Sequence, residues 1–367
     1  MAEEDNIRVS NSSSYPPPFR QQQTEDGDSA ESEQLNSEVV DWEYNSVPVL
    51  DYDKDINYYG TDDDDSGFVV DEICRDWGLF RLVNHGVPPT LLSQLHDQAK
   101  QIFSLPFETK QDIMTTPLSY FWGTPVLSPS GVALSMKGSH QNSSWVEGIN
   151  IPLSQLSKIP PQDHHPTLNS FRVLIEEYGK HLGRLARSIF ERMAKNLNLD
   201  KTESESDLSE LTGFIRAYRY PICSEFSKEH PAWGMDSHTD SSVLSILSCE
   251  DQVGGLQVLK NDNWLTVEPI SNTLIVNLGD MMQAISNDEY KSVKHRVKVN
   301  RYKERISICY FVFPKEGSVI RSINYKPFTY TEFQKQVQQD VKALGFKVGL
   351  DRFKHTTTAA AAITEAC

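Results

Sequence analysis

The hydrophobic period changes near Leu211, and this change constrains the fold more than any other feature of the chain. Before it, from about residue 168 to 197, large apolar residues recur at intervals of three and four, which predicts one long amphipathic helix. After it, short segments alternate in period two, with turn residues between them. The strands expected there are 213–220, 242–248, 256–259, 264–267, 273–278, 293–299 and 305–313. Many short strands at this spacing favour a closed jelly-roll, so we expect a mixed, mainly β fold with flanking helices.

The pattern also divides the chain along its length. We expect a disordered acidic and polar tail over 1–45, because this part is rich in Ser, Gln, Glu, Asp and Pro. A mixed α/β region over 46–205 contains a strand at 79–83 and helices at 67–76 and 91–103. The jelly-roll domain then spans 206–320, a helical segment spans 321–353, and a loose tail spans 354–367.

The charge and the cysteines limit the possible partners and compartments. The formal net charge is −16, and such a surface repels phosphate backbones and anionic lipids, so neither nucleic acid nor a membrane is an expected partner. The five cysteines are widely spaced and form no CxxC pair, which favours a reducing compartment. No secretory segment and no long apolar stretch is visible, so we expect a cytoplasmic protein.

Three residues of the expected strands are candidate metal ligands. His238 and Asp240 are two apart, and in an extended strand such residues point to the same side. His295 alternates with Val293 and Val297, so it enters an apolar interior if those valines do. Two histidines and one carboxylate, with open positions opposite them, are typical of non-haem Fe(II) oxygenases.

A second group predicts an anion site beside this metal. Arg305 and Ser307 are also two apart, on the side of their strand opposite Ile306 and Ile308. An arginine that points into a barrel needs an anion, and a guanidinium with a hydroxyl can clamp one carboxylate. With a further hydrogen bond from Tyr220, the expected guest is the distal carboxylate of 2-oxoglutarate.

Each of these residues has an ordinary alternative. A single histidine in a strand is more often structural, and an Arg-x-Ser pair is more often exposed to solvent. Their order along the chain favours function, because chance places such a set on successive strands far less often. By contrast, His85 sits in a turn and is expected to be structural, and His164 and His165 are expected at the surface.

The motifs resemble those of the plant 2-oxoglutarate/Fe(II) dioxygenases over residues 46 to 353. The similar segments are CRDWGLFRLVNHGV at 74–87, FSLPFE at 103–108, HTD at 238–240, GGLQ at 254–257, NLGD at 277–280, HR at 295–296 and RIS at 305–307. The resemblance implies a double-stranded β-helix core and an enzyme that uses Fe(II), 2-oxoglutarate and O2, with ascorbate as a stimulant. It also implies that His238, Asp240 and His295 hold iron, and that Arg305, Ser307 and Tyr220 hold 2-oxoglutarate.

Within that family the chain is most similar to the gibberellin 2-oxidases that act on C20 gibberellins. The similar segments are WGTP at 122–125, WVE at 145–147, DQVGG at 251–255, YKSV at 290–293 and residues 336–349. This likeness implies 2β-hydroxylation, which inactivates the hormone. Several positions depart from the family pattern: Tyr218 stands where Asn is usual, Ser237 where Pro is usual, and Asp288 where Gly is usual. Met281 and Met282 also replace a bulkier apolar pair.

The expected substrate is a small, mostly apolar acid. Tyr120, Trp122, Trp145 and Met282 are candidate pocket residues, although such side chains can equally be core. The alternatives are another gibberellin oxidation or another plant metabolite, such as a flavonoid. From other classes, they are a non-catalytic binding protein and a zinc hydrolase. Arg305 and Ser307 argue against the hydrolase, because hydrolysis needs no clamp for an oxoacid.

Overall fold

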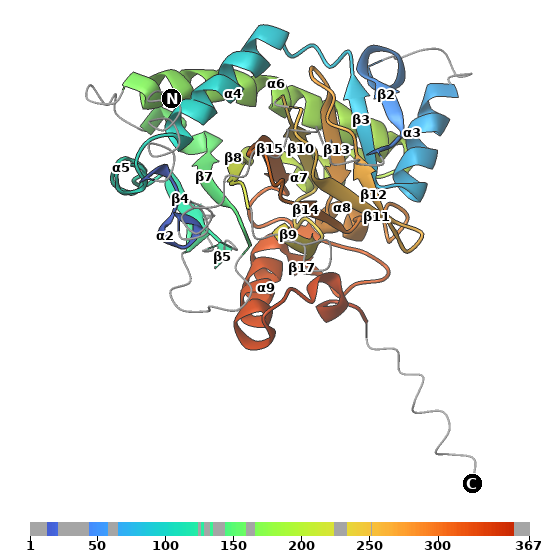
Figure 1. The fold of residues 1–367 in the computed structure, drawn as a ribbon. Coiled ribbons are helices and arrows are strands. Elements are labelled where there is room, and N and C mark those ends of the chain that lie inside the picture. The colour runs from blue at the N-terminus through green and yellow to red at the C-terminus, as the bar shows by residue number, and fades with distance from the viewer. Residues whose placement is uncertain are drawn as a thin grey trace, which may run out of the picture.

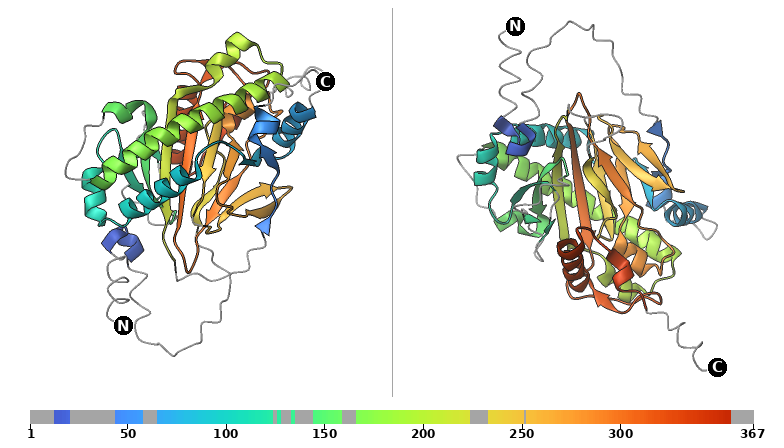
Figure 2. Two further views of the ribbon diagram at one scale, coloured as in Figure 1. Left: turned by 90° about the horizontal axis from the view of Figure 1, so that it is seen from above. Right: turned by 60° about the horizontal axis from the view of Figure 1, so that its bottom comes forward.

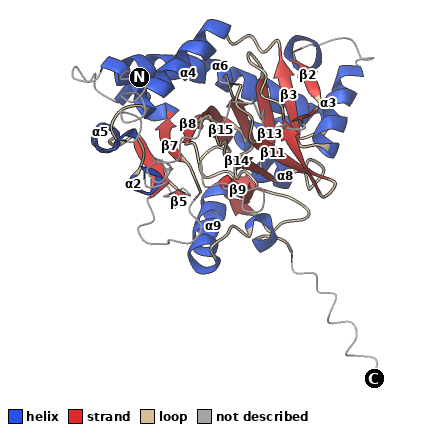
Figure 3. Ribbon diagram, in the orientation of Figure 1, coloured by secondary structure: helices blue, strands red, loops and turns tan. Residues whose placement is uncertain are grey.

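Two β-sheets form the centre of the molecule, and helices surround them (Figures 1 and 3). The computed structural model describes residues 13–20, 44–57, 65–123, 126–127, 133–134, 144–158, 166–223, 233–250 and 252–355. The strands of the two sheets face each other as in a jelly-roll, which confirms the expected fold class.

The larger sheet has eight strands in the order β2-β3-β13-β10-β15-β8-β7-β4. Their bounds are β2 Val49–Asp51, β3 Leu79–Val83, β4 Ser119–Trp122, β7 Glu147–Pro152, β8 Ser209–Tyr220, β10 Leu244–Ser248, β13 Leu274–Leu278 and β15 Arg305–Phe313. Every residue of β15 is buried, because both faces of this sheet are covered. Strands from the region before residue 206 therefore pair directly with strands of the jelly-roll.

The smaller sheet has five strands in the order β1-β12-β11-β14-β9. Their bounds are β1 Tyr44–Asn45, β9 Trp233–His238, β11 Leu256–Lys260, β12 Asn263–Val267 and β14 His295–Lys298. The expected hairpin of β11 and β12 is confirmed. Asn261 and Asp262 form its turn with φ values of 48° and 62°, a conformation that Asn and Asp tolerate well.

Helices cover the outer face of the larger sheet, where α6 lies across the strands with α4 beside it (Figure 2). The helices are α2 Pro17–Arg20, α3 Asp65–Asp76, α4 Pro89–Phe103, α5 Phe107–Ile113, α6 Pro166–Asn196, α7 Lys201–Asp207, α8 Asp280–Ile285 and α9 Tyr330–Leu344. The shorter helical turns are η2 Tyr52–Ile56, η3 Leu153–Lys158 and η4 Gly349–Arg352. The short strands β5 Val126–Leu127, β6 Ala133–Leu134, β16 Val319–Ile320 and β17 Phe328–Thr329 lie outside the two sheets.

The core is divided by the larger sheet into two layers. Ile306, Ile308 and Tyr310 of β15 join the layer that α4 and α6 cover. Cys309, Phe311 and other residues of opposite parity join the layer between the two sheets. The larger sheet thus separates the core layer under the helices from a second layer between the two sheets, which we call the chamber, and the candidate site lies in that second layer.

The amino-terminal region differs in part from the expectation. We expected 1–45 to be disordered, but Tyr15 and Phe19 are each only 1% exposed, and 44–45 form β1. Phe19 packs on Trp145 with ring centroids 4.2 Å apart, and Tyr15 donates a hydrogen bond to Glu304. The buried rings of Tyr15 and Phe19 thus attach residues 13–20 to the folded protein, although the surrounding segment is polar. The rest of 1–45 and most of 354–367 lie outside the described residues, and the other domain boundaries remain predictions.

None of the described helices is both long and apolar enough to cross a membrane. The four described cysteines, Cys74, Cys223, Cys249 and Cys309, are free thiols.

Candidate iron and 2-oxoglutarate site

The three candidate metal ligands come from two neighbouring strands of the smaller sheet and the turn between the sheets. His238 ends β9 and is paired directly with His295, the first residue of β14. Asp240 does not lie on a strand as expected, because β9 ends at His238 and the chain turns there. The turn still brings the carboxylate to the two imidazoles.

The geometry suits one divalent cation. Asp240 Oδ1 lies 3.7 Å from His238 Nε2 and 3.7 Å from His295 Nε2. One ligand atom from each residue falls within 4.8 Å of the others, so a single ion can contact all three. This is the only such group of three or more His, Cys, Asp or Glu residues in the described part of the chain.

Hydrogen bonds hold the far side of each ligand. Ser245 and Asn277 both donate to Asp240 Oδ2, at 2.6 and 2.8 Å, which leaves Oδ1 turned toward the histidines. The Nδ1 atoms of His238 and His295 lie 2.7 and 3.3 Å from the carbonyl oxygens of Asp236 and Val293. An Nδ1–H that donates to a carbonyl leaves the Nε2 lone pair free for a metal.

The electrostatics favour the protonation states that a metal needs. Burial, followed by the neighbouring His295, lowers the pKa of His238 to about 4. Burial acts to raise the pKa of Asp240, but the two histidines and the bonds from Ser245 and Asn277 hold it below its ordinary value. At neutral pH the site therefore presents a neutral imidazole at His238 and a carboxylate at Asp240.

Arg305, Ser307 and Tyr220 come together as expected. Arg305 is paired with Tyr220 across β15 and β8, and its guanidinium lies 5.1 Å from the centre of the Tyr220 ring. Its Nη1 donates to Ser307 Oγ at 3.0 Å, and its Nη2 donates to Cys249 Sγ at 2.9 Å. A guanidinium beside a hydroxyl in this way suits a carboxylate ligand.

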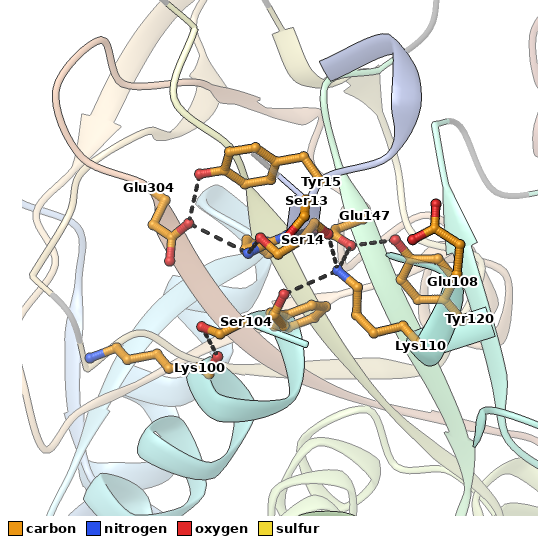
Figure 4. Close-up of polar contacts among 12 residues, drawn as sticks. Ser13, Ser14, Tyr15, Lys100, Ser104, Glu108, Lys110, Tyr120, Glu147 and Glu304 are labelled. Atoms are coloured by element: carbon orange, nitrogen blue, oxygen red, sulfur yellow. Dashed lines mark hydrogen bonds and ion pairs between the residues drawn. The ribbon is translucent and has the colours of Figure 1, made fainter. Parts of the chain in front are cut away.

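Two of the four expected pocket residues, Tyr120 and Trp122, lie on β4. Trp122 packs against the layer between the two sheets, where the ring of Phe19 also contacts it. Figure 4 shows Tyr120 directed at Glu147, to which its hydroxyl donates. Contact of either residue with a substrate remains a prediction.

The other two candidates differ from each other. Met282 is fully buried in the core layer under the helices, and its contact with a substrate remains a prediction. Trp145 belongs to the layer between the sheets, and its backbone N–H donates to the carbonyl of Trp233 at the start of β9. Its contact with a substrate remains a prediction.

The sequence analysis did not identify the residues that hold Asp240. It also did not identify Arg216, a cation in the interior. Asn277 is the only polar residue of the apolar strand Leu274–Leu278, and this contrast could have pointed to it. Arg216 alternates with Phe214 and Tyr218 on β8, which is the same signal that identified Arg305. His85 is structural as expected, with Nε2 3.2 Å from the carbonyl oxygen of Asn272.

A jelly-roll with two histidines and one carboxylate beside an arginine clamp defines a class of protein: the mononuclear non-haem Fe(II) oxygenases that use a 2-oxo acid. The family profile described as 2OG-Fe(II) oxygenase superfamily matches residues 212–314. The profile described as non-haem dioxygenase in morphine synthesis N-terminal matches residues 47–170.

Individual relatives of the chain are also dioxygenases or oxygenases. Gibberellin 2-beta-dioxygenase 6 of Oryza sativa subsp. japonica is 35% identical over 296 residues, which cover 77% of this chain and 78% of the relative. Gibberellin 2-beta-dioxygenase 8 of Arabidopsis thaliana is 34% identical over 312 residues, which cover 84% and 86%. The crystal structure of JOX2 in complex with 2OG, Fe and JA is 29% identical, with a TM-score of 0.64 over 80% of this chain and 86% of JOX2. The chain belongs to the 2OG-Fe(II) oxygenase superfamily and is an Fe(II)- and 2-oxoglutarate-dependent dioxygenase.

Proposed function

We propose that this dioxygenase hydroxylates a small, mostly apolar carboxylic acid, and that the acid is a gibberellin which it 2β-hydroxylates and so inactivates. Iron and 2-oxoglutarate supply the activation of O2 when they are bound. In this proposal His238, Asp240 and His295 hold the iron. Arg305, Ser307 and Tyr220 orient the co-substrate through its distal carboxylate.

One observation carries the acidic character of the substrate: Arg216 is a buried interior cation without a counter-charge. Only 7% of it is exposed, and no carboxylate pairs with it among the described residues. Its Nε donates to Asn150 Oδ1 at 3.0 Å and its Nη1 reaches Tyr218 Oη at 3.5 Å. Its Nη2 is buried and has no hydrogen-bond partner in the part of the chain that the structure describes.

The strand register supports a substrate role for Arg216, because it lies on the same face as the residues proposed to bind 2-oxoglutarate. Successive pairs across β15 and β8 on this face are Arg305 with Tyr220, Ser307 with Tyr218, and Cys309 with Arg216. A strand rises about 3.3 Å per residue, so Arg216 lies roughly 13 Å along the ladder from the pair that clamps 2-oxoglutarate. That separation matches a substrate carboxylate bound beyond the co-substrate on the same face.

The surroundings of Arg216 are apolar. Its guanidinium lies 4.8 Å from the ring centre of Phe214, 5.6 Å from that of Phe311 and 5.9 Å from that of Phe121. A carboxylate on a hydrocarbon body would find both an apolar wall and a charge-assisted hydrogen bond here. Gibberellins have this chemistry, and the two gibberellin 2-beta-dioxygenases among the relatives support that choice.

One departure from the family pattern bears on the fit of the substrate. Tyr218, which stands where Asn is usual, is buried in the chamber and stacks on Tyr220 with ring centroids 6.1 Å apart. Its ring is larger than the usual asparagine side chain, so it leaves less space for a substrate next to Arg305, Ser307 and Tyr220.

The solved structure of JOX2 contains the ligand called JA, which makes another small acid the second candidate substrate.

We place the enzyme in the cytoplasm, which its free thiols support.

A substrate panel tests the proposal. Purified protein with Fe(II), ascorbate and 2-oxoglutarate is incubated with C19 gibberellins, C20 gibberellins and JA, and succinate and products are measured by mass spectrometry. We expect a gibberellin to stimulate succinate release and to gain one oxygen atom at C2. Stimulation by JA alone, with no gibberellin product, would replace the gibberellin assignment by the second candidate.

The role of Arg216 has its own test. Arg216→Met should raise KM for the acid by about 10- to 100-fold, because a hydrogen bond to a charged group contributes roughly 1.5–3 kcal/mol. The dissociation constant for 2-oxoglutarate should not change. The methyl ester of the same substrate should be used equally well by the variant and the wild type. If the variant discriminated against the ester as strongly as against the acid, Arg216 would not be reading the carboxylate.

A further inference from the structure

The turn that carries Asp240 is held from outside the chamber by a lysine near the end of the chain. Helix α9 ends at Gly345, whose φ of 83° reverses the chain direction and sends the following residues back toward the smaller sheet. Lys347 Nζ then donates to the carbonyl oxygen of Thr239 at 2.6 Å and lies 3.3 Å from Ser241 Oγ. It also pairs with Asp280 Oδ2 at 2.7 Å.

These contacts fall on both sides of a metal ligand. Thr239 is the single residue between His238 and Asp240, and Ser241 follows Asp240 directly. The ammonium group of Lys347 therefore fixes the peptide before Asp240 and the side chain after it. Neither contact involves an atom of His238, Asp240 or His295 that would bind the metal.

Asp280 joins the lysine to the same turn by a second route. Its backbone N–H donates to the carbonyl of Asp240 at 2.8 Å, while its carboxylate holds Lys347. The N–H of Met281 donates to the carbonyl of Ser242 at 3.1 Å. The start of α8 and the tip of Lys347 thus fix the backbone from Thr239 to Ser242, which bears the ligand outside the regular strand.

The chain is shaped to permit this arrangement. The Lys347 side chain is only 16% exposed and that of Asp280 only 5%, so solvent screens the pair weakly. Gly349 lies next to the pair with φ of 76°, a backbone conformation that favours glycine. An ammonium offers three donors with free rotation, and here it meets three acceptors.

We propose that Lys347 is a positioning residue for the iron centre, which sets the placement of Asp240 relative to His238 and so couples the carboxy-terminal segment to metal binding. The proposal rests on His238, Asp240 and His295 as the iron ligands, and it does not depend on which acid is the substrate. It gives the segment after α9 a part in the reaction without any contact to substrate.

Metal binding by the purified apo-protein tests the proposal without any turnover. Co(II), which accepts the same nitrogen and oxygen ligands and has a visible spectrum, is titrated into the wild type and Lys347→Met, and its affinity is measured by calorimetry. We expect Lys347→Met to bind Co(II) at least about tenfold more weakly, as outer-shell changes usually do, and to alter the ligand-field bands. Lys347→Gln, which keeps two donors without the charge, should fall between the two.

Two controls separate positioning from general damage. Lys342→Met removes an exposed lysine of the last turn of α9 and should leave the Co(II) affinity and spectrum unchanged. Asp280→Asn combined with Lys347→Met should weaken binding by less than the product of the two single effects, because both act on one turn. If Lys347→Met does not fold, the Co(II) affinity and spectrum of Lys347→Gln provide the test.

The proposal fails if a folded Lys347 variant binds Co(II) with the affinity and the spectrum of the wild type. It fails as well if His295→Ala binds Co(II) as tightly as the wild type, because the metal would then not be held by these ligands. A different substrate would change neither result, so failure of the gibberellin assignment is distinguishable from failure of this proposal.

Discussion

At the scale of single residues, Glu147 shows how much of the fold depends on one buried charge. Its carboxylate accepts from Lys110, Tyr120 and Arg219, and the side chains of Lys110 and Arg219 are 0% and 2% exposed (Figure 4). Burial lowers the pKa of Lys110 to about 8, and the nearby Glu147 opposes that shift. Two buried cations thus share one buried anion.

Glu147→Gln should destabilise the protein by about 3–5 kcal/mol, because it leaves these two cations without their main counter-charge. The free energy of unfolding in urea measures the effect. Glu108→Gln is the matched control, since Glu108 pairs with Arg20 at the exposed surface and should show no comparable loss. Equal losses in the two variants would mean that burial of the charge is not what makes Glu147 important.

At the scale of elements, α4 carries a histidine that couples its packing to pH. His96 is 1% exposed and its Nε2 lies 3.3 Å from Ser248 Oγ of β10. Burial, then the charges of Lys100 and Arg305, lower the pKa of His96 to about 3. The unfolded chain takes up a proton near pH 6.5, whereas the folded chain does not until far lower pH.

Stability should therefore fall as the pH drops from about 6.5 toward 3, by about 1.4 kcal/mol per pH unit for this histidine. His96→Leu should flatten the dependence in that window, when unfolding free energies at several pH values are compared. His355→Leu, an exposed position, should keep the slope of the wild type. An unchanged slope in His96→Leu would show that other groups set the acid sensitivity.

Comparison of these elements with the sequence shows what could be predicted and why. The long helix, the β11–β12 hairpin, β3 and β15 followed from periodicity and from the turn residues that bound them, although both faces of β15 are buried. His238 and Asp240 were expected on one strand, but the rest of β9 was not predicted, since WGMDSH at 233–238 alternates too weakly. The candidate iron and 2-oxoglutarate residues could be proposed from the sequence because polar side chains on an apolar face need a purpose. The pocket residues remain predictions, since size alone cannot tell an aromatic that contacts substrate from one that packs in the core.

At the scale of the whole molecule, segments near both ends of the described chain contact the two sheets. Near the carboxy-terminal end, Lys347 contacts the turn that carries Asp240. Near the amino-terminal end, residues 13–20 pack on the edge of the larger sheet. The Ser14 carbonyl accepts from Lys110 at 2.7 Å and from Arg219 at 3.1 Å, and Ser14 Oγ accepts from Arg219 at 3.2 Å. The amino-terminal segment therefore completes the hydrogen bonding of two buried cations.

Deletion of residues 1–20 should lower the unfolding free energy by at least about 2 kcal/mol, because three hydrogen bonds to charged donors outweigh the entropy of ordering the segment. Deletion of residues 1–12 alone, which leaves those contacts in place, should cost little. Chemical denaturation of the two truncated proteins provides the comparison. Equal stability of both would mean that the segment is an attachment and not a part of the fold.

The most direct measurement of the central claim follows both atoms of O2. The enzyme is supplied with labelled O2, Fe(II), 2-oxoglutarate and the gibberellin that most stimulates turnover, and label is measured in succinate and product. The account predicts one labelled atom in succinate and one in the hydroxylated gibberellin, in equal amounts. A hydroxylated product without label, or one formed in the absence of 2-oxoglutarate, would contradict it.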